Sequence, residues 1–151
     1  MRLLRSRATT SKDHLDLAES EVREAIDDLR GVARGLYPVV LRESGLGAAL
    51  AALAEHRLLR IGDVPETRYP TVVESTAYRL VALASEGSPS TVSIEDHGAT
   101  ITVRVDVEAE LPDLTEIRDR ATTINGQLTV SGGTASSRIA LVLPVPLGVS
   151  A

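Results

Sequence analysis

Few side chains in this 151-residue chain could do covalent or metal chemistry. The chain contains no cysteine, which excludes a thiol nucleophile, a cysteine-bound zinc ion and a disulfide framework. Its three histidines, His14, His56 and His97, stand far apart, and no pair has the spacing of metal ligands. Lys12 is the only lysine and Asn125 the only asparagine, so chemistry that needs either residue type elsewhere is excluded.

Composition indicates one ordinary-sized globular chain with an aliphatic interior. Hydrophobic residues make up 43% of the chain but aromatic residues only 2%, so Leu, Val, Ile and Ala must build the core. A formal charge of −5 argues against a nucleic-acid partner, and we interpret Arg2, Arg5 and Arg7 as a solvated helix end. No apolar run reaches the roughly 20 residues of a membrane span, and no signal peptide is visible. We therefore expect a cytoplasmic protein with no membrane span in this chain.

A heptad pattern runs through the N-terminal part of the chain. It predicts a helix from about residue 12 that ends before Pro38, because a proline disfavours helical conformation in the preceding residue. Residues 1–8 are interpreted as the end of an earlier helix, so that 1–37 form a helical hairpin arm. Such an arm cannot bury its own apolar face, and we expect a homodimer. The alternative is that this seam packs on the C-terminal domain of the same chain. The seam residues, spaced alternately by three and four positions, are Leu15, Ala18, Val22, Ala25, Leu29, Val32 and Leu36.

The first half of the remaining chain predicts two helices and a short strand. Residues 38–43 are interpreted as a connector, and Ser44 as the cap of a helix with Leu46, Ala49, Leu50, Leu53 and Ala54 on its apolar stripe. Residues 57–61 suit a short strand before turn signals. The next helix is predicted over 70–85, with Pro70 in its first turn. Its expected inward residues are Val72, Val73, Ala77, Leu80, Val81 and Ala84.

Two hairpins and one more helix complete the predicted domain. Strands over 91–95 and 99–107 flank a turn at Asp96-His97-Gly98, and a helix follows over 113–124. Strands over 127–131 and 138–144 flank a second turn at Gly132-Gly133. The order of elements predicts the α+β class, with one mixed sheet and helices on one of its faces.

Segments at both ends of this region resemble a known family. They are Glu21–Arg30 (EVREAIDDLR), Ala33–Leu41 (ARGLYPVVL) and Gly45–Leu50 (GLGAAL), then Asp119–Ala121, Gly126–Val130 (GQLTV) and Leu143-Pro144. Together they are similar to bacterial sensor histidine kinases of the NarX and DesK type, over about residues 12–146. The resemblance implies a dimerisation helix and a Bergerat-type (GHKL) ATP-binding domain. It also implies phosphate transfer from ATP to a histidine and then to a response-regulator aspartate.

The phosphoacceptor that this resemblance implies is not found in the chain. In the family the histidine lies on the first dimerisation helix, is followed by Asp or Glu, and precedes the segment that begins at Glu21. His14 is interpreted instead as a solvated residue at a helix start, His56 as one at a helix end, and His97 as part of a hairpin turn.

The nucleotide-binding motifs that the resemblance implies are also missing. The matching helix, 71–85, contains no asparagine to present an amide to Mg²⁺ and the phosphates, and Asn125 lies in a distant turn. The Asp-x-Gly-x-Gly box is expected after Val107, where Glu108-Ala109-Glu110-Leu111-Pro112 stands. Asp96-x-Gly98 is a partial match, one strand too early and with Thr100 in place of the second glycine.

The glycine-rich lid that cradles phosphates in the family is also absent, because Leu111 and Asp113 lead almost directly into the last helix. Gly132-Gly133-Thr134 is similar to the last glycine box, although a hairpin turn explains it equally well.

These observations lead to one prediction and one main alternative. The prediction is a helical dimerisation arm over 1–37 followed by a reduced, two-layer histidine kinase-like ATPase domain over 44–146 that lacks the lid. This degenerate module would have no catalytic, metal-binding or cofactor-binding residues and no nucleotide cofactor. It would act by dimerisation, with a response regulator or another histidine kinase as partner. The alternative is the ATP-binding domain of an active sensor histidine kinase that binds Mg-ATP. An anti-sigma-type binder of the same fold would also normally keep the ATP motifs.

Overall fold

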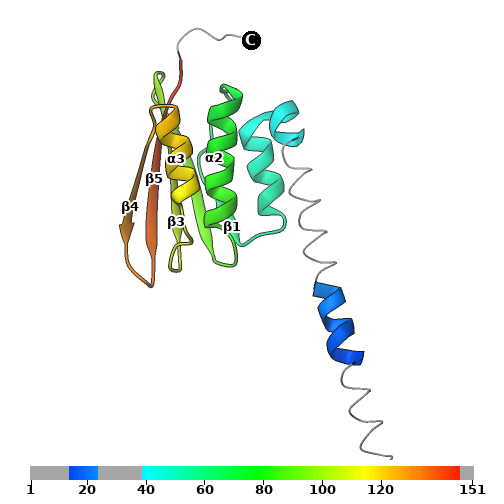
Figure 1. Ribbon diagram of the computed structural model, residues 1–151. Helices are drawn as coiled ribbons and strands as arrows, with labels where there is room; N and C mark the ends of the chain where they lie inside the picture. Colours follow the sequence, from blue (N-terminus) through cyan, green and yellow to red (C-terminus); the bar gives the residue numbers. More distant parts are fainter. Residues whose placement is uncertain (1–13, 24–38, 147–151) are drawn as a thin grey trace, which may run out of the picture. The chain divides into compact units, whose positions relative to one another are not determined.

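A computed structural model describes residues 14–23 and 39–146 of the chain (Figure 1). The chain divides into two compact units, Met1–Leu36 and Tyr37–Ala151. In the first unit, residues 14–23 form a helix whose side chains are all exposed, including Leu15, Ala18 and Val22 of the predicted seam. The other seam residues, Ala25, Leu29, Val32 and Leu36, lie outside the described residues, so the seam remains a prediction.

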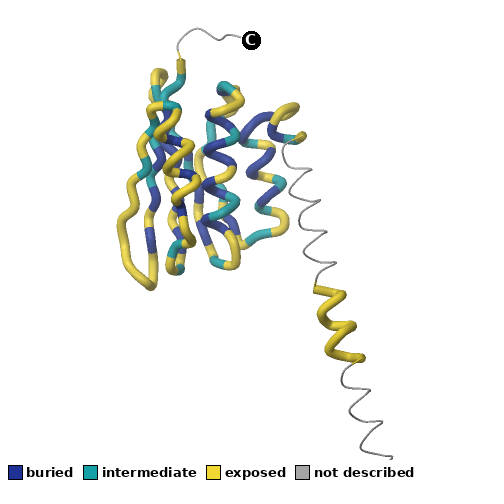
Figure 2. The backbone as a smooth tube through the Cα atoms, viewed as in Figure 1, coloured by how far each residue is buried: buried dark blue, intermediate teal, exposed yellow. Residues whose placement is uncertain are grey.

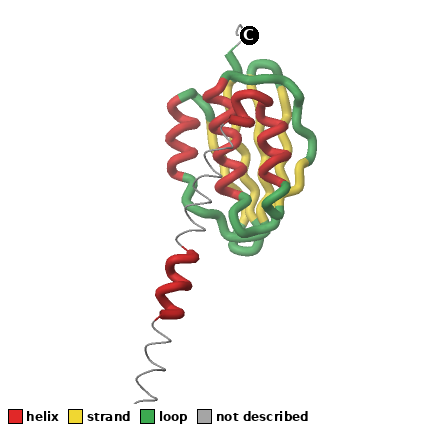
Figure 3. Tube along the Cα trace, turned by 90° about the vertical axis from the view of Figure 1, so that its right-hand side faces the viewer, coloured by secondary structure: helices red, strands yellow, loops and turns green. Residues whose placement is uncertain are grey.

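The second unit is an α+β sandwich with a mixed, five-stranded sheet. A helical stretch over 39–54 comes first. It is followed by β1 (Leu59–Ile61), α2 (Thr71–Ala84), β2 (Ser90–Asp96), β3 (Thr100–Val107), α3 (Thr115–Thr123), β4 (Gln127–Gly132) and β5 (Ser137–Pro144). The strand order is β1-β2-β3-β5-β4, with β1 parallel to β2 and every other neighbouring pair antiparallel. The helices cover one face of the sheet (Figure 3). The predicted fold class is confirmed, and each labelled element lies within about two residues of its expected bounds.

The two faces of the sheet have opposite chemistry because successive side chains of a strand point to opposite sides. On β3, Ile101, Val103 and Val105 are buried, whereas Arg104 and Asp106 are exposed (Figure 2). Arg104 pairs with Glu95 of β2, and Arg138 Nε of β5 lies 2.6 Å from Asp106 Oδ1. The face away from the helices is therefore a solvated surface held by ion pairs between neighbouring strands.

The core between sheet and helices is aliphatic, as composition predicts. The predicted stripe of the helix over 39–54 is buried at Leu46, Ala49, Leu50 and Leu53, and Ala54 is partly buried. On α2 the buried apolar residues are Val73, Ala77, Tyr78, Leu80, Val81 and Ala84. Two tyrosines, Tyr69 and Tyr78, are the aromatic members of this core. Among the described residues, no helix is long and apolar enough to cross a membrane.

The expectation that Val72 faces inward is wrong, because 47% of its surface is exposed. The face of α2 that is buried includes Glu74 instead, which is only 2% exposed. Glu74 Oε1 accepts hydrogen bonds from Arg68 Nε and from the backbone N–H of Tyr69, each at 3.0 Å. A buried carboxylate must be paired and hydrogen-bonded, so this ion pair helps to set the rotation of the first turn of α2.

The expected connector before the first helix of this unit is also wrong. Residues 39–43 are helical, and Ser44 lies inside the helical stretch over 39–54 rather than before it. Arg68 Nη2 donates to the carbonyl oxygens of Leu41 at 3.4 Å and Arg42 at 3.0 Å. Gly45 follows with φ of +86°. The helical stretch over 39–54, drawn in cyan, changes direction within its length (Figure 1). A cation and a left-handed glycine are both usual at a helix C-terminus, so Arg68 caps the helical residues that precede Gly45.

Gly45→Ala tests this junction. A Cβ atom at residue 45 would lie 2.7 Å from Arg68 Cδ, and any L residue there pays about 1–2 kcal/mol for the left-handed conformation. We expect a loss of unfolding free energy larger than that conformational cost alone, measured by chemical denaturation. Gly87→Ala is the matched control, because Gly87 has φ of +77° but nothing within 4 Å of its added Cβ. Equal losses in the two variants would contradict a specific role for the contact with Arg68.

Candidate nucleotide site

The segments that the family resemblance assigns to nucleotide binding meet at one end of the second unit. They are the C-terminal end of α2, the chain after β3, and the N-terminal end of α3. The backbone N–H of Glu108, after β3, donates to the carbonyl oxygen of Pro89, after α2, at 3.0 Å. The fold therefore brings the expected segments together, and their side chains decide what this end of the domain can bind.

The last turn of α2 presents small and apolar groups at this end. Ala84 is buried, Leu83 is partly buried against the core, and the Ser85 hydroxyl is buried without a hydrogen-bond partner. The Ser85 backbone N–H closes the helix by donating to the Val81 carbonyl oxygen at 2.9 Å. Mg²⁺ with nucleotide phosphates needs oxygen ligands on a fixed frame, and neither an amide nor a carboxylate side chain lies on α2 at its C-terminal end.

The segment after β3 is packed against the core. Leu114 is buried, and Ala109 and Leu111 lie partly buried against the core. Ser137 Oγ of β5 donates to the Ala109 carbonyl oxygen at 3.3 Å and so ties the segment to the sheet. Between β3 and α3 the aliphatic side chains thus lie against the core, whereas the side chains of Glu108 and Glu110 are exposed.

The carboxylate nearest the start of α3 is engaged locally. Asp113 Oδ1 accepts the backbone N–H of Thr115 at 2.9 Å and the Thr115 hydroxyl at 2.6 Å. These two hydrogen bonds, the hydroxyl first, lower the pKa of Asp113 below its usual value. Asp113 is therefore an ionised residue that holds the first turn of α3 in place.

Asp96, the partial match to the adenine-binding aspartate, is not brought to this end of the domain. It is the last residue of β2, whereas the chain after α2 enters β2 at Ser90. Asp96 Oδ1 accepts the Gly98 N–H at 2.8 Å, and Oδ2 accepts the Tyr69 hydroxyl at 2.9 Å. These bonds lower the pKa of Asp96. The pKa of Tyr69 is raised, mainly because the side chain is partly buried and secondly because its hydroxyl donates to Asp96. Asp96 thus holds the β2–β3 turn against Tyr69, two residues before α2.

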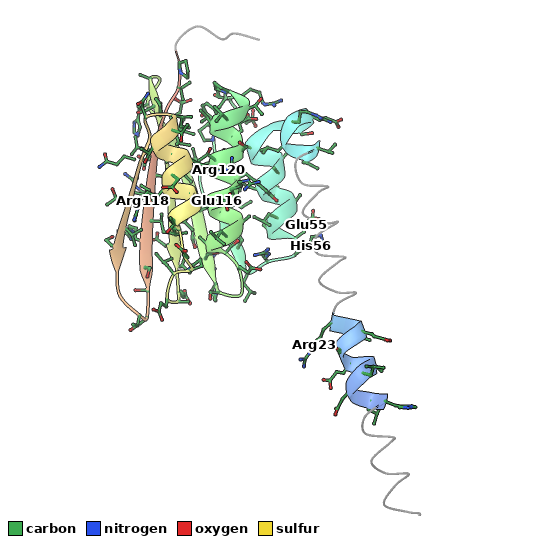
Figure 4. All side chains as sticks on the ribbon, in the orientation of Figure 1. Arg23, Glu55, His56, Glu116, Arg118 and Arg120 are labelled. Atoms are coloured by element: carbon green, nitrogen blue, oxygen red, sulfur yellow. The ribbon has the colours of Figure 1, made fainter. Side chains whose placement is uncertain are left out.

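Helix α3 is in direct contact with α2. Arg79 Nη1 of α2 lies 2.5 Å from Glu116 Oε1 of α3, and Arg120 Nε lies 3.3 Å from the same oxygen. Figure 4 shows Glu116 and Arg120 on the side of α3 nearer α2, with Arg118 on the other side. Ile117 and Ala121 of α3 are buried beneath these charges. Two arginines thus share one glutamate, so this cluster carries a net positive charge.

Two polar hollows lie at the same end of the sheet. The first, of about 360 Å³, is lined by Thr91, Asp106, Ser131, Arg138 and their neighbours. The second, of about 350 Å³, includes Arg57, Leu58, Arg60 and Glu108. Arg138 is neutralised by Asp106, and Arg57 donates to the Ala82 carbonyl oxygen at 3.2 Å. Both hollows include the hydroxyl side chains of Ser90 and Thr91 together with the carboxylate of Glu108.

The histidines and acidic residues within the described parts of the chain form no metal centre. No group of three or more His, Cys, Asp or Glu side chains among those residues could hold a metal ion. His56 follows the helix over 39–54 (Figure 4), and His97 Nε2 lies 3.6 Å from Glu95 Oε2 in the β2–β3 turn. His14 is exposed in the helix over 14–23.

Comparison with known proteins gives a fold likeness only. No protein-family model matches the chain, and no curated protein matches it. Among solved structures, the Erythrobacter litoralis EL346 blue-light activated histidine kinase is 13% identical, with a TM-score of 0.55 over 79% of this chain and 50% of that chain. The chain thus shares a histidine-kinase-like fold. It spans half the length of that kinase.

Two further solved structures are weaker matches. The histidine kinase domain of the same Erythrobacter litoralis protein is 14% identical, with a TM-score of 0.49 over 67% of this chain and 59% of that chain. The Acinetobacter baumannii histidine kinase AdeS is 10% identical, with a TM-score of 0.47 over 80% of each chain.

Sequence reasoning missed two ion pairs, the buried-carboxylate pair Arg68–Glu74 and the exposed pair Arg79–Glu116. One signal was present for the first pair. Glu74 lies between Val73 and Ala77 on the buried side of α2, and an acid in that phase needs a nearby cation such as Arg68. The second pair joins residues 37 positions apart, which no local pattern predicts.

Asp96→Asn tests the structural role of this aspartate. Since the folded-state pKa of Asp96 lies below its unfolded value, its ionisation stabilises the fold at neutral pH, and this contribution is lost as the pH falls through the folded pKa. We expect Asp96→Asn to reduce the difference in urea midpoint between pH 7 and pH 3. Tyr69→Phe, which removes one of the two hydrogen bonds, should have an intermediate effect. A full wild-type pH dependence in Asp96→Asn would show that other carboxylates carry the effect.

Proposed function

We propose that this chain is a degenerate histidine-kinase-like module of the NarX and DesK type. It works in cytoplasmic two-component signalling by self-association and protein interaction, without a nucleotide cofactor and without phosphotransfer. One observation carries the proposal: Ala109, Leu111 and Leu114 pack on the core where the resemblance requires the adenine-binding box and the lid. The missing asparagine on α2 and the engagement of Asp96 in a turn support the same conclusion.

The proposed dimer uses the predicted seam of the N-terminal arm. In the helix over 14–23, Leu15, Ala18 and Val22 are separated by three and four positions, so they share one side of the helix. Leu15 and Val22 are each more than half exposed. Apolar residues in this arrangement are typical of helices that associate with a second helix. The proposed partner of this acidic chain is a response regulator or another histidine kinase. Nucleic acid is not a proposed partner.

A second candidate function is the ATP-binding domain of an active sensor histidine kinase. The fold likeness to a blue-light activated histidine kinase favours it. In that case an atypical set of groups at the C-terminal end of α2 would hold Mg-ATP, and the phosphoacceptor histidine would be supplied by another chain or segment.

Titration with Mg-ATP separates the two functions. Ligand that binds only the native state raises stability by RT ln(1 + [L]/Kd), about 2.7 kcal/mol at one hundred times Kd. For the degenerate module we expect no change in the melting temperature up to millimolar Mg-ATP, followed by differential scanning fluorimetry. A saturable increase with Mg-ATP, absent with MgCl₂ alone, would contradict the proposal and support the kinase.

Charged substitutions in the seam test self-association. Val22→Glu together with Leu29→Glu would place carboxylates in the seam, where burial of an unpaired charge is costly. We expect the double variant to lose the dimer that the arms form in the wild type. Sedimentation velocity measures the change. Leu17→Glu is the matched control, because Leu17 is exposed on the same helix but outside the heptad positions. If the wild type and the double variant sediment as assemblies of the same mass, the proposed seam is wrong.

A further inference from the structure

Strand β4 forms an open edge of the sheet. It lies last in the strand order, paired only with β5, and Figure 1 shows it at the outer side of the domain. An edge strand presents a row of unpaired N–H and C=O groups to any extended chain that approaches it, and natural proteins protect such edges with charges, prolines or short strands.

The two edges of this sheet differ in their protection. At the β1 edge the strand has only three residues, Arg57 and Arg60 lie within or beside it, and Pro65 follows. At the β4 edge the strand has six residues, and no charged side chain occurs between Arg120 and Arg138. In a chain in which one residue in four is charged, this gap leaves β4 without any of the usual protection.

The register shows which backbone groups of β4 face outward. Gly133 N–H donates to the Ser136 carbonyl oxygen at 2.9 Å, just beyond the ladder in which Ser131 pairs with Arg138 and Thr129 with Ala140. Because hydrogen-bonded pairs alternate in an antiparallel ladder, Thr129 and Ser131 bond to β5, and the N–H and C=O groups of Leu128 and Val130 point away from the sheet. In the described parts of the chain these outward groups have no hydrogen-bond partner.

We propose that β4 pairs with β4 of a second copy of this chain, antiparallel and about a two-fold axis at Thr129. In this register Leu128 and Val130 of each copy face Val130 and Leu128 of the partner subunit, and each such pair exchanges two N–H···O bonds. On the helix side of the sheet, the partly buried Leu128 would cover Val130, which is 42% exposed. On the other side, the exposed Thr129 hydroxyls of the two copies would meet.

A second copy fits this edge better than an unrelated peptide because the edge is complementary to itself. A two-fold axis brings the same patch of both copies together, so any charge near the axis would meet a like charge. The residues from Gln127 to Gly132 carry none. Thr–Thr pairs directly opposite each other are among the stabilising pairs of antiparallel sheets. This interface requires neither the N-terminal arm nor the absence of nucleotide, so it is independent of the proposed function.

Charge placed at the axis tests the pairing. Thr129→Lys and Thr129→Glu each put like charges directly opposite across the axis, and each should shift the full chain to a smaller assembly in sedimentation velocity. An equimolar mixture of the two variants should restore the wild-type assembly, because Lys then faces Glu. Thr91→Lys is the matched control, because Thr91 is exposed on the same face of the interior strand β2. It should sediment like wild type.

Amide hydrogen exchange identifies the strand directly. In concentrated wild type the amides of Leu128 and Val130 should exchange at least roughly tenfold more slowly than in Thr129→Lys, while the Ser131 amide, bonded to β5, is protected in both. Repeating the experiment with Val22→Glu and Leu29→Glu removes any arm contact, and the slow exchange should persist. The proposal is wrong if the Leu128 and Val130 amides exchange at the same rate at every concentration. It is also wrong if the Lys–Glu mixture behaves like the single variants.

Discussion

The buried carboxylate of Glu74 is the interaction on which the helical layer depends. Removed from water, it is held by Arg68 and by the Tyr69 N–H, and Arg68 then reaches the carbonyl groups of Leu41 and Arg42. A charge in this position is stable only with its partner, so the start of α2, the loop before it and the helix over 39–44 adopt one arrangement together. Gly45 completes it, because a side chain there would meet Arg68.

The rest of the domain is held by aliphatic packing between the sheet and the helices. The buried faces of β3 and β5 meet helices, and ion pairs link neighbouring strands on the exposed face of the sheet. The segment after β3 adds apolar surface to the same core. Buried apolar area of this kind stabilises the fold, whereas buried unpaired polar groups do not.

The same packing leaves two different edges on the sheet. β1 is short and lies beside arginines, whereas β4 is longer and uncharged. Nothing in the aliphatic core requires β4 to be free of charge, because its outward backbone groups and most of its side chains lie outside that core. A role in association gives a physical reason for this composition.

Local patterns in the sequence determined the elements. Period-two alternation placed β2, β3 and β5, the turn residues Asn125-Gly126 and Gly132-Gly133 placed the second hairpin, and the apolar stripe placed α2. Asn125 adopts the left-handed conformation that such a turn needs. These features depend on neighbours within a few positions, so one sequence contains enough information to predict them.

Only the tertiary structure decided the rotation of α2, the helical conformation of residues 39–44, and the roles of the charged residues. Val72 is exposed and Glu74 is buried because Arg68 offers a partner to a buried carboxylate. Asp96 accepts a hydrogen bond from Tyr69, 27 positions away in the sequence, and Arg79 donates one to Glu116, 37 positions away. The sequence alone showed which residues the family resemblance implies and the chain does not contain. Only the packing showed that Leu111 and Leu114 lie against the core, because burial depends on contacts between distant segments.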